Sequence, residues 1–295
     1  MDDATVTDTK PTLAVLGLGT MGRAMAATAH RSGIPVVVWN RDPAAADEFS
    51  EMGVEVARSV ADAAAAADVI ITMVTNADAV RSIATEQGLI EALRPGSVWV
   101  QMSTIGAEAT EQLLALFGAQ RADAHFVDAP VSGSKVPAEN GKLVIFASGP
   151  DEARPLVQPV FDAIGQRTLW LGPAGNGSRM KLVNNVLLAF TAEGLANSLA
   201  LAHRLGLPTS VVVEAFDGGP LISAWETGKL RRIEQDEYSA EFALALALKD
   251  VHLALDDGGP EQFKVLAALA SEWEEVVGRG LGDQDVTVVT QALSD

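Results

Sequence analysis

The sequence predicts an α/β fold in which a doubly wound parallel sheet is followed by an all-α domain. Two observations predict it: short β-branched runs alternate with alanine-rich helical stretches in the first part of the chain, and the strand signals stop after residue 172. The length of 295 residues suits about two domains. We expect a flexible tail at 1–11, a sheet domain at 12–173 and the all-α domain at 174–295.

Five apolar runs are predicted to be strands of the parallel sheet, because strands that are buried on both faces are apolar at nearly every position. A further strand is expected to end at Phe126 and Val127, and TLWLG at 168–172 is the last strand signal. The five runs are TLAVL at 12–16, VVVW at 36–39, VIITMV at 69–74, VWVQM at 98–102 and LVIFAS at 143–148.

A long helix is predicted from about Ser178 to about Arg204, where a glycine and a proline soon follow. At 1.5 Å per residue this helix spans about 40 Å. Its apolar residues face nearly all sides, so we expect it to be the covered core of the all-α domain, completed by a partner subunit. Two more helical stretches, near 242–257 and 260–278, are separated by glycines and a proline.

Charge and composition exclude several classes of function. Lys and Arg total 21 against 39 Asp and Glu, which gives a net charge of −18. A nucleic-acid partner is not expected, because binding phosphates needs a basic face, and an anionic membrane is disfavoured for the same reason. With no cysteine and four histidines, neither disulfides nor a metal site is expected. The acidic N-terminus and the interrupted apolar stretches predict a soluble, cytoplasmic protein.

A glycine-rich turn follows the first predicted strand and opens a helical stretch. It reads Gly17-Leu18-Gly19-Thr20-Met21-Gly22. The first glycine allows the tight turn, the second lets backbone N–H groups approach a pyrophosphate, and the third allows close packing of helix on strand. The N-terminus of the helix adds partial positive charge. In this strand–turn–helix context the motif predicts a dinucleotide site, so we expect residues 12–173 to be a dinucleotide-binding Rossmann domain; the alternative is a glycine turn with no ligand.

The end of the second predicted strand bears on which dinucleotide binds. Asn40 stands where a carboxylate would hold the ribose hydroxyls of NAD, and the guanidinium of Arg41 suits a 2′-phosphate. NADP is therefore favoured, with NAD as the alternative. For Asp42 two alternatives are open: its carboxylate binds a ribose hydroxyl of the cofactor, or it forms an ion pair with Arg41 on the surface.

Two segments carry residues suited to carbonyl chemistry. In DAPVSGS, Ser132, Gly133 and Ser134 offer donors to a small carboxylate, or they form an ordinary serine turn. Lys181 lies in a nearly apolar stretch of the long helix, where a desolvated ammonium is suited to proton transfer with a carbonyl oxygen; the alternative is a lysine that reaches to solvent. Asn185 lies four residues further on, so it shares the helix face of Lys181.

The stretch FALALALKD offers weaker candidates. Seven residues separate Phe242 from Lys249, which brings them to one helix face. Lys249 is predicted to reach the cofactor, or else to pair with Asp250 or Glu241. Phe242 either walls the substrate pocket or belongs to the core, and Trp225 has the same two alternatives.

Five motifs in this order resemble the β-hydroxyacid dehydrogenase family, which includes 3-hydroxyisobutyrate dehydrogenases, tartronate semialdehyde reductases and glyoxylate/succinic semialdehyde reductases. The resemblance covers nearly all of the chain beyond the tail. The motifs are GLGTMG at 17–22, VQMSTI at 100–105, DAPVSGS at 128–134, GNGSRMKLVNN at 175–185 and FALALALKD at 242–250.

The resemblance implies an NAD(P)-dependent oxidoreductase that interconverts a small β-hydroxyacid and its semialdehyde or keto acid, with an all-α domain that commonly dimerises. It implies that Lys181 is the catalytic acid/base and that Asn185 and Ser132-Gly133 contact the substrate carboxylate or oxygen. Lys249 becomes a cofactor or active-site contact. The resemblance implies further cofactor contacts at the carboxyl ends of two predicted strands: Met73, Val74 and Thr75 at one, and Ser103 or Thr104 at the other.

Three alternatives remain. Imine reductases share this architecture but typically carry Asp or Tyr where Lys181 stands. A non-catalytic dinucleotide-binding sensor would keep the glycine turn and lose the proton donor. The 6-phosphogluconate dehydrogenases are related but commonly longer.

Overall fold

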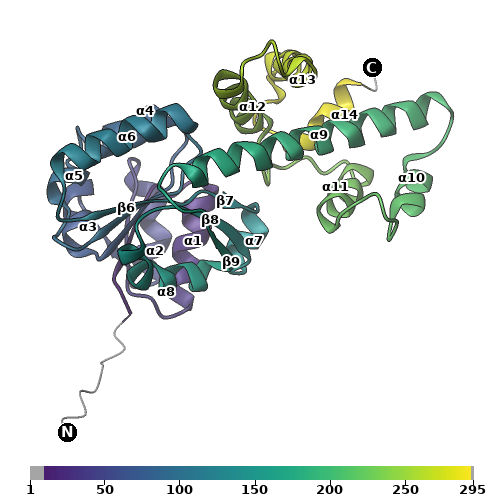
Figure 1. The fold of residues 1–295 in the computed structure, drawn as a ribbon. Helices are drawn as coiled ribbons and strands as arrows, with labels where there is room; N and C mark the ends of the chain where they lie inside the picture. The colour runs from purple at the N-terminus through teal and green to yellow at the C-terminus, as the bar shows by residue number, and fades with distance from the viewer. Residues whose placement is uncertain (1–9, 294–295) are drawn as a thin grey trace, which may run out of the picture. The chain divides into compact units, whose positions relative to one another are not determined.

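The computed structural model describes residues 10–293, and within them the chain divides into two compact units between Lys181 and Leu182. The first unit contains the sheets and the second is helical (Figure 1). The predicted fold class is confirmed. The division falls inside a helix, eight residues after the end of the predicted sheet domain. Most of the predicted tail at 1–11 lies outside the described residues.

The main sheet has six parallel strands in the order β3-β2-β1-β4-β5-β6. The chain enters at the central strand β1, winds outward on one side and then returns to β4 on the other side. The order therefore reverses between β1 and β4, and ligands of such sheets bind at the carboxyl ends there. The strands are β1 (Leu13–Leu16), β2 (Val36–Trp39), β3 (Glu55–Val56), β4 (Val69–Thr72), β5 (Val98–Gln101) and β6 (His125–Asp128).

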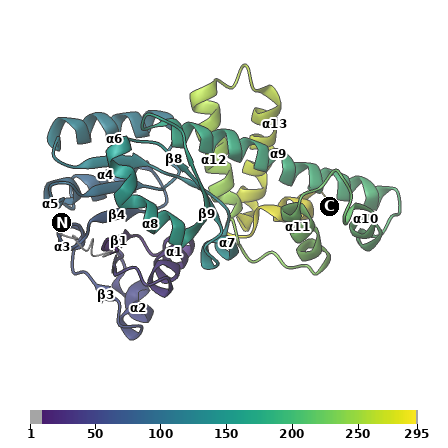
Figure 2. The ribbon, with the colours of Figure 1, turned by 60° about the horizontal axis from the view of Figure 1, so that its bottom comes forward.

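Helices cover both faces of this sheet (Figure 2). Successive side chains of a strand point to opposite faces of the sheet. In β1, Leu13 and Val15 pack into one core cluster, and Ala14 and Leu16 pack into the other. The first cluster contains residues of α1 (Thr20–Arg31), η1 (Pro43–Ala46), α2 (Asp47–Glu51) and α8 (Arg154–Ile164). The second contains residues of α3 (Val60–Ala66), α4 (Ala77–Ala84), α5 (Leu89–Ala92) and α6 (Ala107–Gln120).

A second sheet of three strands follows β6. Its strands are β7 (Val131–Ser132), β8 (Leu143–Ala147) and β9 (Gly165–Trp170), with β7 antiparallel and β9 parallel to β8. α7 (Lys135–Glu139) and η2 (Asp151–Ala153) lie between them in the chain.

The prediction that 143–148 is a strand of the parallel sheet is wrong in its partners, although it is a strand. Two residues join β6 to β7, which is too short for the crossover that a parallel strand needs, so the chain turns away into the second sheet. The two sheets meet at one antiparallel bridge between Asp128 and Ser148. An apolar run indicates burial and not the direction of the strand.

The long helix α9 (Asn176–Arg204) begins two residues before its predicted start and ends where predicted. Ala189, Ala192 and Ala196 on one side are buried in the core of the helical unit. On another side, Val183 and Leu187 are 64% and 69% exposed. One side of α9 is thus covered by other described elements of the chain, and the cover of its exposed side by a partner subunit stays a prediction.

By length and composition alone, α9 could cross a membrane: an 18-residue window has a mean hydropathy of 1.3, and 33% of that window is buried. The core helix of a soluble protein meets the same criteria. Within the helical unit, Asn185 of α9 is hydrogen-bonded to Asp250 of α12 (Leu244–Gly258), and Glu193 of α9 is hydrogen-bonded to Trp273 of α13 (Lys264–Val276). These bonds are those of a helix that packs within a bundle.

Two predicted stretches of the helical unit are confirmed as α12 and α13, whereas α10 and α11 were not predicted. The segment 209–234 is interrupted by Gly218, Gly219 and Pro220, and α10 contains three successive valines, which favour strands, so its helices are hidden in the sequence. The elements are α10 (Thr209–Phe216), α11 (Ala224–Glu234), α12 (Leu244–Gly258), α13 (Lys264–Val276), η3 (Val277–Leu281), η4 (Val286–Val288) and α14 (Val289–Ala292).

Candidate active site

The glycine turn after β1 is held by close backbone packing. A Cβ at Gly17, whose φ is +104°, would lie 2.4 Å from the Met73 carbonyl oxygen, and a Cβ at Gly22 would lie 2.0 Å from the Gly17 carbonyl oxygen. At Gly19 a Cβ would stand in open space. Helix α1 begins after Gly19 with no side-chain cap and with no acidic residue in its first turn. These features fit a dinucleotide, because the first-turn N–H groups are left to an anion and the turn leaves space for one.

Asn40 braces this turn from the end of β2. Its Oδ1 accepts a hydrogen bond from the Leu18 amide at 2.9 Å, and its Nδ2 donates to the Asp42 carbonyl at 2.9 Å. The Asp42 carboxylate accepts from the Ala44 amide and caps η1, which is neither of the two uses predicted for it. Arg41 is exposed between them. The structure therefore brings the β2 end and the glycine turn together, with the guanidinium side chain on the surface.

The segments after β4 and β5 are tied together by Ser103. This residue is 1% exposed, and its Oγ accepts from the Val74 amide at 2.8 Å. Its own amide donates to the Gln101 side chain at 2.7 Å. The Ser103 hydroxyl is thus engaged by the protein, and the next residue, Thr104, is only partly buried. Thr75 follows Val74 and is exposed.

Lys181 lies against the strand that carries the predicted carboxylate donors. Its Nζ donates to the Val131 carbonyl at 2.7 Å, and Ser132 and Gly133 follow directly in the chain. Gly133 has a φ of +125°, and a Cβ there would lie 2.9 Å from the Leu143 side chain, so a glycine is required. Two segments about fifty residues apart in sequence, both predicted to be functional, are therefore neighbours.

A buried polar cluster at the start of α9 was missed by the sequence analysis. Asp128 is fully buried, and its two carboxylate oxygens accept from the Ser178 Oγ and the Ser178 amide, both at 2.7 Å. Ser148 Oγ accepts from the Gly177 amide at 2.9 Å, and Thr110 Oγ1 lies 3.0 Å from Ser178 Oγ. Burial raises the pKa of Asp128, and the hydrogen bonds from Ser178 oppose that rise. An aspartate at a strand end and a serine at a helix start are the signals that point to such a cap.

In the helical unit, Asn185 and Lys249 meet at Asp250. Asn185 Nδ2 donates to Asp250 Oδ2 at 2.5 Å, and Asn184 Nδ2 donates to Asn185 Oδ1 at 2.9 Å. Lys249 Nζ lies 2.6 Å from Asp250 Oδ1, so the second of its predicted alternatives is present. Asp250 is 4% exposed and was not selected as a site residue from the sequence.

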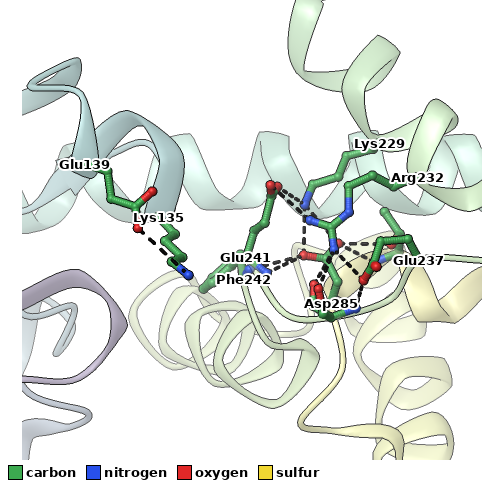
Figure 3. A network of polar contacts seen from close by, with 10 residues as sticks. Lys135, Glu139, Lys229, Arg232, Glu237, Glu241, Phe242 and Asp285 are labelled. Atoms are coloured by element: carbon green, nitrogen blue, oxygen red, sulfur yellow. Dashed lines mark hydrogen bonds and ion pairs between the residues drawn. The ribbon is translucent and has the colours of Figure 1, made fainter. Parts of the chain in front are cut away.

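Phe242 lies beside a buried ionic network just before α12 (Figure 3), and Trp225 contacts the Lys229 side chain of the same network. Lys229 is 2% exposed, and its Nζ contacts both Asp285 and Glu241 at 2.8 Å. Asp285 also accepts from the Glu241 and Phe242 amides. Burial would raise the pKa of Asp285, but the charge of Lys229 and these donors lower it. Both aromatic residues pack against the core, and the Trp225 ring lies 5.7 Å from Lys229 Nζ.

Comparison with protein families matches both units. Residues 12–172 match the NAD binding domain of 6-phosphogluconate dehydrogenase. Residues 175–293 match the NAD-binding domain of NADP-dependent 3-hydroxyisobutyrate dehydrogenase. The two matches together cover nearly the whole described chain.

Individual proteins are similar to this chain over nearly its full length. Glyoxylate/succinic semialdehyde reductase 1 of Arabidopsis thaliana is 32% identical over 281 residues, which cover 94% of this chain and 96% of that protein. The structure of Mycobacterium tuberculosis 3-hydroxyisobutyrate dehydrogenase with L-serine has a TM-score of 0.83 and 27% identity over 97% of this chain and 100% of that one. An imine reductase from Myxococcus stipitatus with NADP⁺ shares the fold, with a TM-score of 0.66 and 22% identity over 95% of this chain and 99% of that one.

Proposed function

Because the chain belongs to the β-hydroxyacid dehydrogenase family, we propose that it is an NADP-preferring enzyme that interconverts a small β-hydroxyacid and its semialdehyde or keto acid. One observation carries the proposal beyond the family. The Lys181 ammonium lies on the carbonyl of Val131, directly before Ser132 and Gly133. A proton donor thus stands beside backbone and hydroxyl donors suited to a carboxylate, as reduction of a carbonyl acid requires.

The chain's own residues have separate tasks in this reaction. The glycine turn and the N-terminus of α1 hold the dinucleotide, which when bound supplies a hydride to the carbonyl carbon. In the reductive direction, Lys181 Nζ gives a proton to the carbonyl oxygen and becomes a neutral amine, which then takes a proton from solvent. In the oxidative direction the neutral amine removes the hydroxyl proton. Ser132 and the Gly133 amide hold the substrate carboxylate so that the carbonyl faces Lys181.

Replacement of Lys181 tests the proton-transfer role. We expect Lys181→Ala to lower kcat for succinic semialdehyde and glyoxylate by about 10²-fold or more, with the affinity for NADPH unchanged within about twofold. Lys142→Ala is the matched control, because Lys142 is an exposed lysine of the same unit. Full activity of the Lys181 variant would remove the acid/base assignment.

The preference for NADP is supported by the exposed guanidinium of Arg41 beside the turn that Asn40 braces. We expect Arg41→Ala to raise the KM for NADPH about tenfold and to leave the KM for NADH nearly unchanged, since only NADPH carries the 2′-phosphate. Arg167→Ala, at an exposed arginine of β9, serves as the control. Equal effects on both cofactors would contradict the preference.

A second candidate function is imine reduction, because an imine reductase shares the fold. The two substrates are compared under one set of conditions, with a cyclic imine against succinic semialdehyde. Faster turnover of the imine would favour this second function. NADPH binding with no turnover of either substrate would instead favour a sensor that only binds dinucleotides.

We also propose that the protein forms a homodimer or a higher homo-oligomer through the exposed side of α9. Val183, Leu187 and Leu201 are more than half exposed there, and burial of such side chains drives association. Light scattering coupled to size exclusion is expected to give at least twice the chain mass. A monomer at micromolar concentration would disprove this.

A further inference from the structure

We propose that Asp128 and Ser178 are positioning residues that hold Lys181 in its reactive place, an inference that rests on the proposed function. Neither residue needs to touch the substrate to do this. They act through the start of α9, which begins two residues before Ser178 and carries Lys181 three residues after it.

Both carboxylate oxygens of Asp128 accept hydrogen bonds from Ser178 of α9. One oxygen accepts from the backbone amide of Ser178 and the other from the Ser178 hydroxyl, each at 2.7 Å. A carboxylate held by two donors of one residue fixes both the height and the rotation of the helix at that residue. Asp128 is 0% exposed and Ser178 is 3% exposed, so water does not compete for these bonds.

Two further contacts prevent the first turn of α9 from shifting. The amide of Gly177 donates to Ser148 Oγ at 2.9 Å. A Cβ at Gly177 would lie 2.3 Å from the Phe146 carbonyl oxygen and 2.7 Å from the Asp128 carbonyl oxygen, so the helix backbone rests directly on the strand ends. The turn that contains Ser178 is therefore set by contacts of the first unit alone.

The geometry of the helix carries this constraint to Lys181. Three residues along an α-helix are a rise of about 4.5 Å and a rotation of about 300°, so Ser178 and Lys181 lie on nearly the same face. Lys181 Nζ then reaches the carbonyl of Val131, which is three residues after Asp128 in the chain. The contacts form a closed ring from Asp128 to Ser178, along the helix to Lys181, and back through Val131.

This ring explains why one short segment combines such different residues. Asp128 anchors the helix, Val131 accepts from the lysine, and Ser132 with Gly133 are the proposed carboxylate donors. The same backbone segment therefore fixes the position of the Lys181 ammonium and carries the proposed carboxylate donors. A displacement of about 1 Å between reacting groups can cost about 10²-fold in rate, which is the effect that the anchor prevents.

Ser178→Ala is the first test, because it removes one bond of the anchor and leaves the Ser178 amide in place. We expect kcat for succinic semialdehyde to fall about tenfold, with the Kd for NADPH within about twofold of the unsubstituted protein. Ser97→Ala is the matched control: Ser97 is also 3% exposed, its Oγ donates to the Arg94 carbonyl, and it lies before β5 at the other end of the strands. The control is expected to keep kcat within about twofold.

A double-mutant cycle separates positioning from simple loss of structure. If Ser178 acts through Lys181, the effect of Ser178→Ala on kcat shrinks to less than about twofold when Lys181→Ala is already present. An equal loss in both backgrounds would mean a structural role and would overturn the proposal. Asp128→Asn, which exchanges one acceptor for a donor, is expected to follow the same pattern with a larger loss.

The outcomes also distinguish this proposal from the proposed function. A large loss in Lys181→Ala together with unchanged kcat in Ser178→Ala overturns the positioning role alone and leaves the lysine as the proton donor. Full activity in Lys181→Ala overturns both. If Asp128→Asn does not fold, the double-mutant cycle of Ser178→Ala and Lys181→Ala still tests whether the anchor positions Lys181.

Discussion

Among single residues, the clearest steric requirement is at Gly22 in α1. A Cβ there would lie 2.0 Å from the Gly17 carbonyl oxygen, whereas a Cβ at Gly118 in α6 would meet nothing within 4 Å. We expect Gly22→Ala to weaken NADPH binding at least tenfold and to lower the free energy of unfolding by about 2 kcal/mol or more, as overpacking does. Gly118→Ala should stabilise by about 0.5–1 kcal/mol, because alanine favours the helix. Calorimetry would measure the stability of both variants, and NADPH fluorescence would measure their cofactor binding. Unchanged NADPH binding by Gly22→Ala would contradict the assignment of the glycine turn as the dinucleotide site.

Glu193 of α9 makes the stability of the helical unit depend on pH. Burial and the negative charge of Glu272 raise the pKa of Glu193, although Trp273 donates to it at 2.8 Å. A carboxyl with a raised pKa in the folded state stabilises fully below its unfolded pKa and loses that contribution as pH rises through the folded pKa. Glu272→Gln should therefore reduce the loss of unfolding free energy as pH rises from the ordinary glutamate pKa of about 4.3 towards neutrality, measured in urea by tryptophan fluorescence. Glu261→Gln, at an exposed loop glutamate, should leave that loss unchanged.

A site residue can be predicted from the sequence when its side chain is chemically unusual among its neighbours in the chain. Lys181 in an apolar stretch and the donors of DAPVSGS meet this condition, and the structure brings them together. Asp128 does not, because its partner Ser178 is fifty residues away and the pair becomes visible only in the fold. The same holds for Asp250, because its hydrogen bond from Asn185 joins two helices and is visible only in the fold.

Among the elements, the turn before α12 depends on a buried ion pair. Lys229 and Asp285 are 2% and 0% exposed in their side chains, and Asp285 also receives the amides of Glu241 and Phe242. Removal of one partner leaves a buried charge uncompensated, so we expect Lys229→Ala to lower the unfolding free energy of the helical unit by about 3–5 kcal/mol. Arg231→Ala removes an exposed pair with Asp217 and should cost less than about 1 kcal/mol. Equal losses of unfolding free energy in Lys229→Ala and Arg231→Ala would mean that burial does not strengthen the contribution of the ion pair.

The strands show how far apolar pattern alone can locate elements. The predicted runs that became β1, β2, β4 and β5 match the observed bounds closely, since each is buried on both faces. β3 has two exposed residues, Glu55 and Val56, and gives no such signal. The run that became β8 has the right length and burial, but its partners were set by the short connection from β6, which apolarity does not encode.

At the scale of the whole molecule, the net charge of −18 opposes capture of an anionic substrate. Salt screens this repulsion over about 10 Å at 0.1 M, so we expect the KM for glyoxylate to fall as ionic strength rises from about 0.01 M to about 0.2 M. An uncharged aldehyde should show no such change. A KM for glyoxylate that rises with salt would mean that local cations dominate its capture.

The continuity of α9 through the boundary between the units has a consequence for changes in chain length. Each residue inserted between Lys181 and Asn185 would turn everything that follows by about 100° around the helix axis and advance it by about 1.5 Å. Asn185 would then leave its angular phase relative to Lys181. Seven inserted residues would restore that phase to within about 20°, but at an added length of about 10 Å. Within α9, a single insertion or deletion therefore changes the helix face on which Asn185 lies relative to Lys181, whereas a substitution leaves that face unchanged.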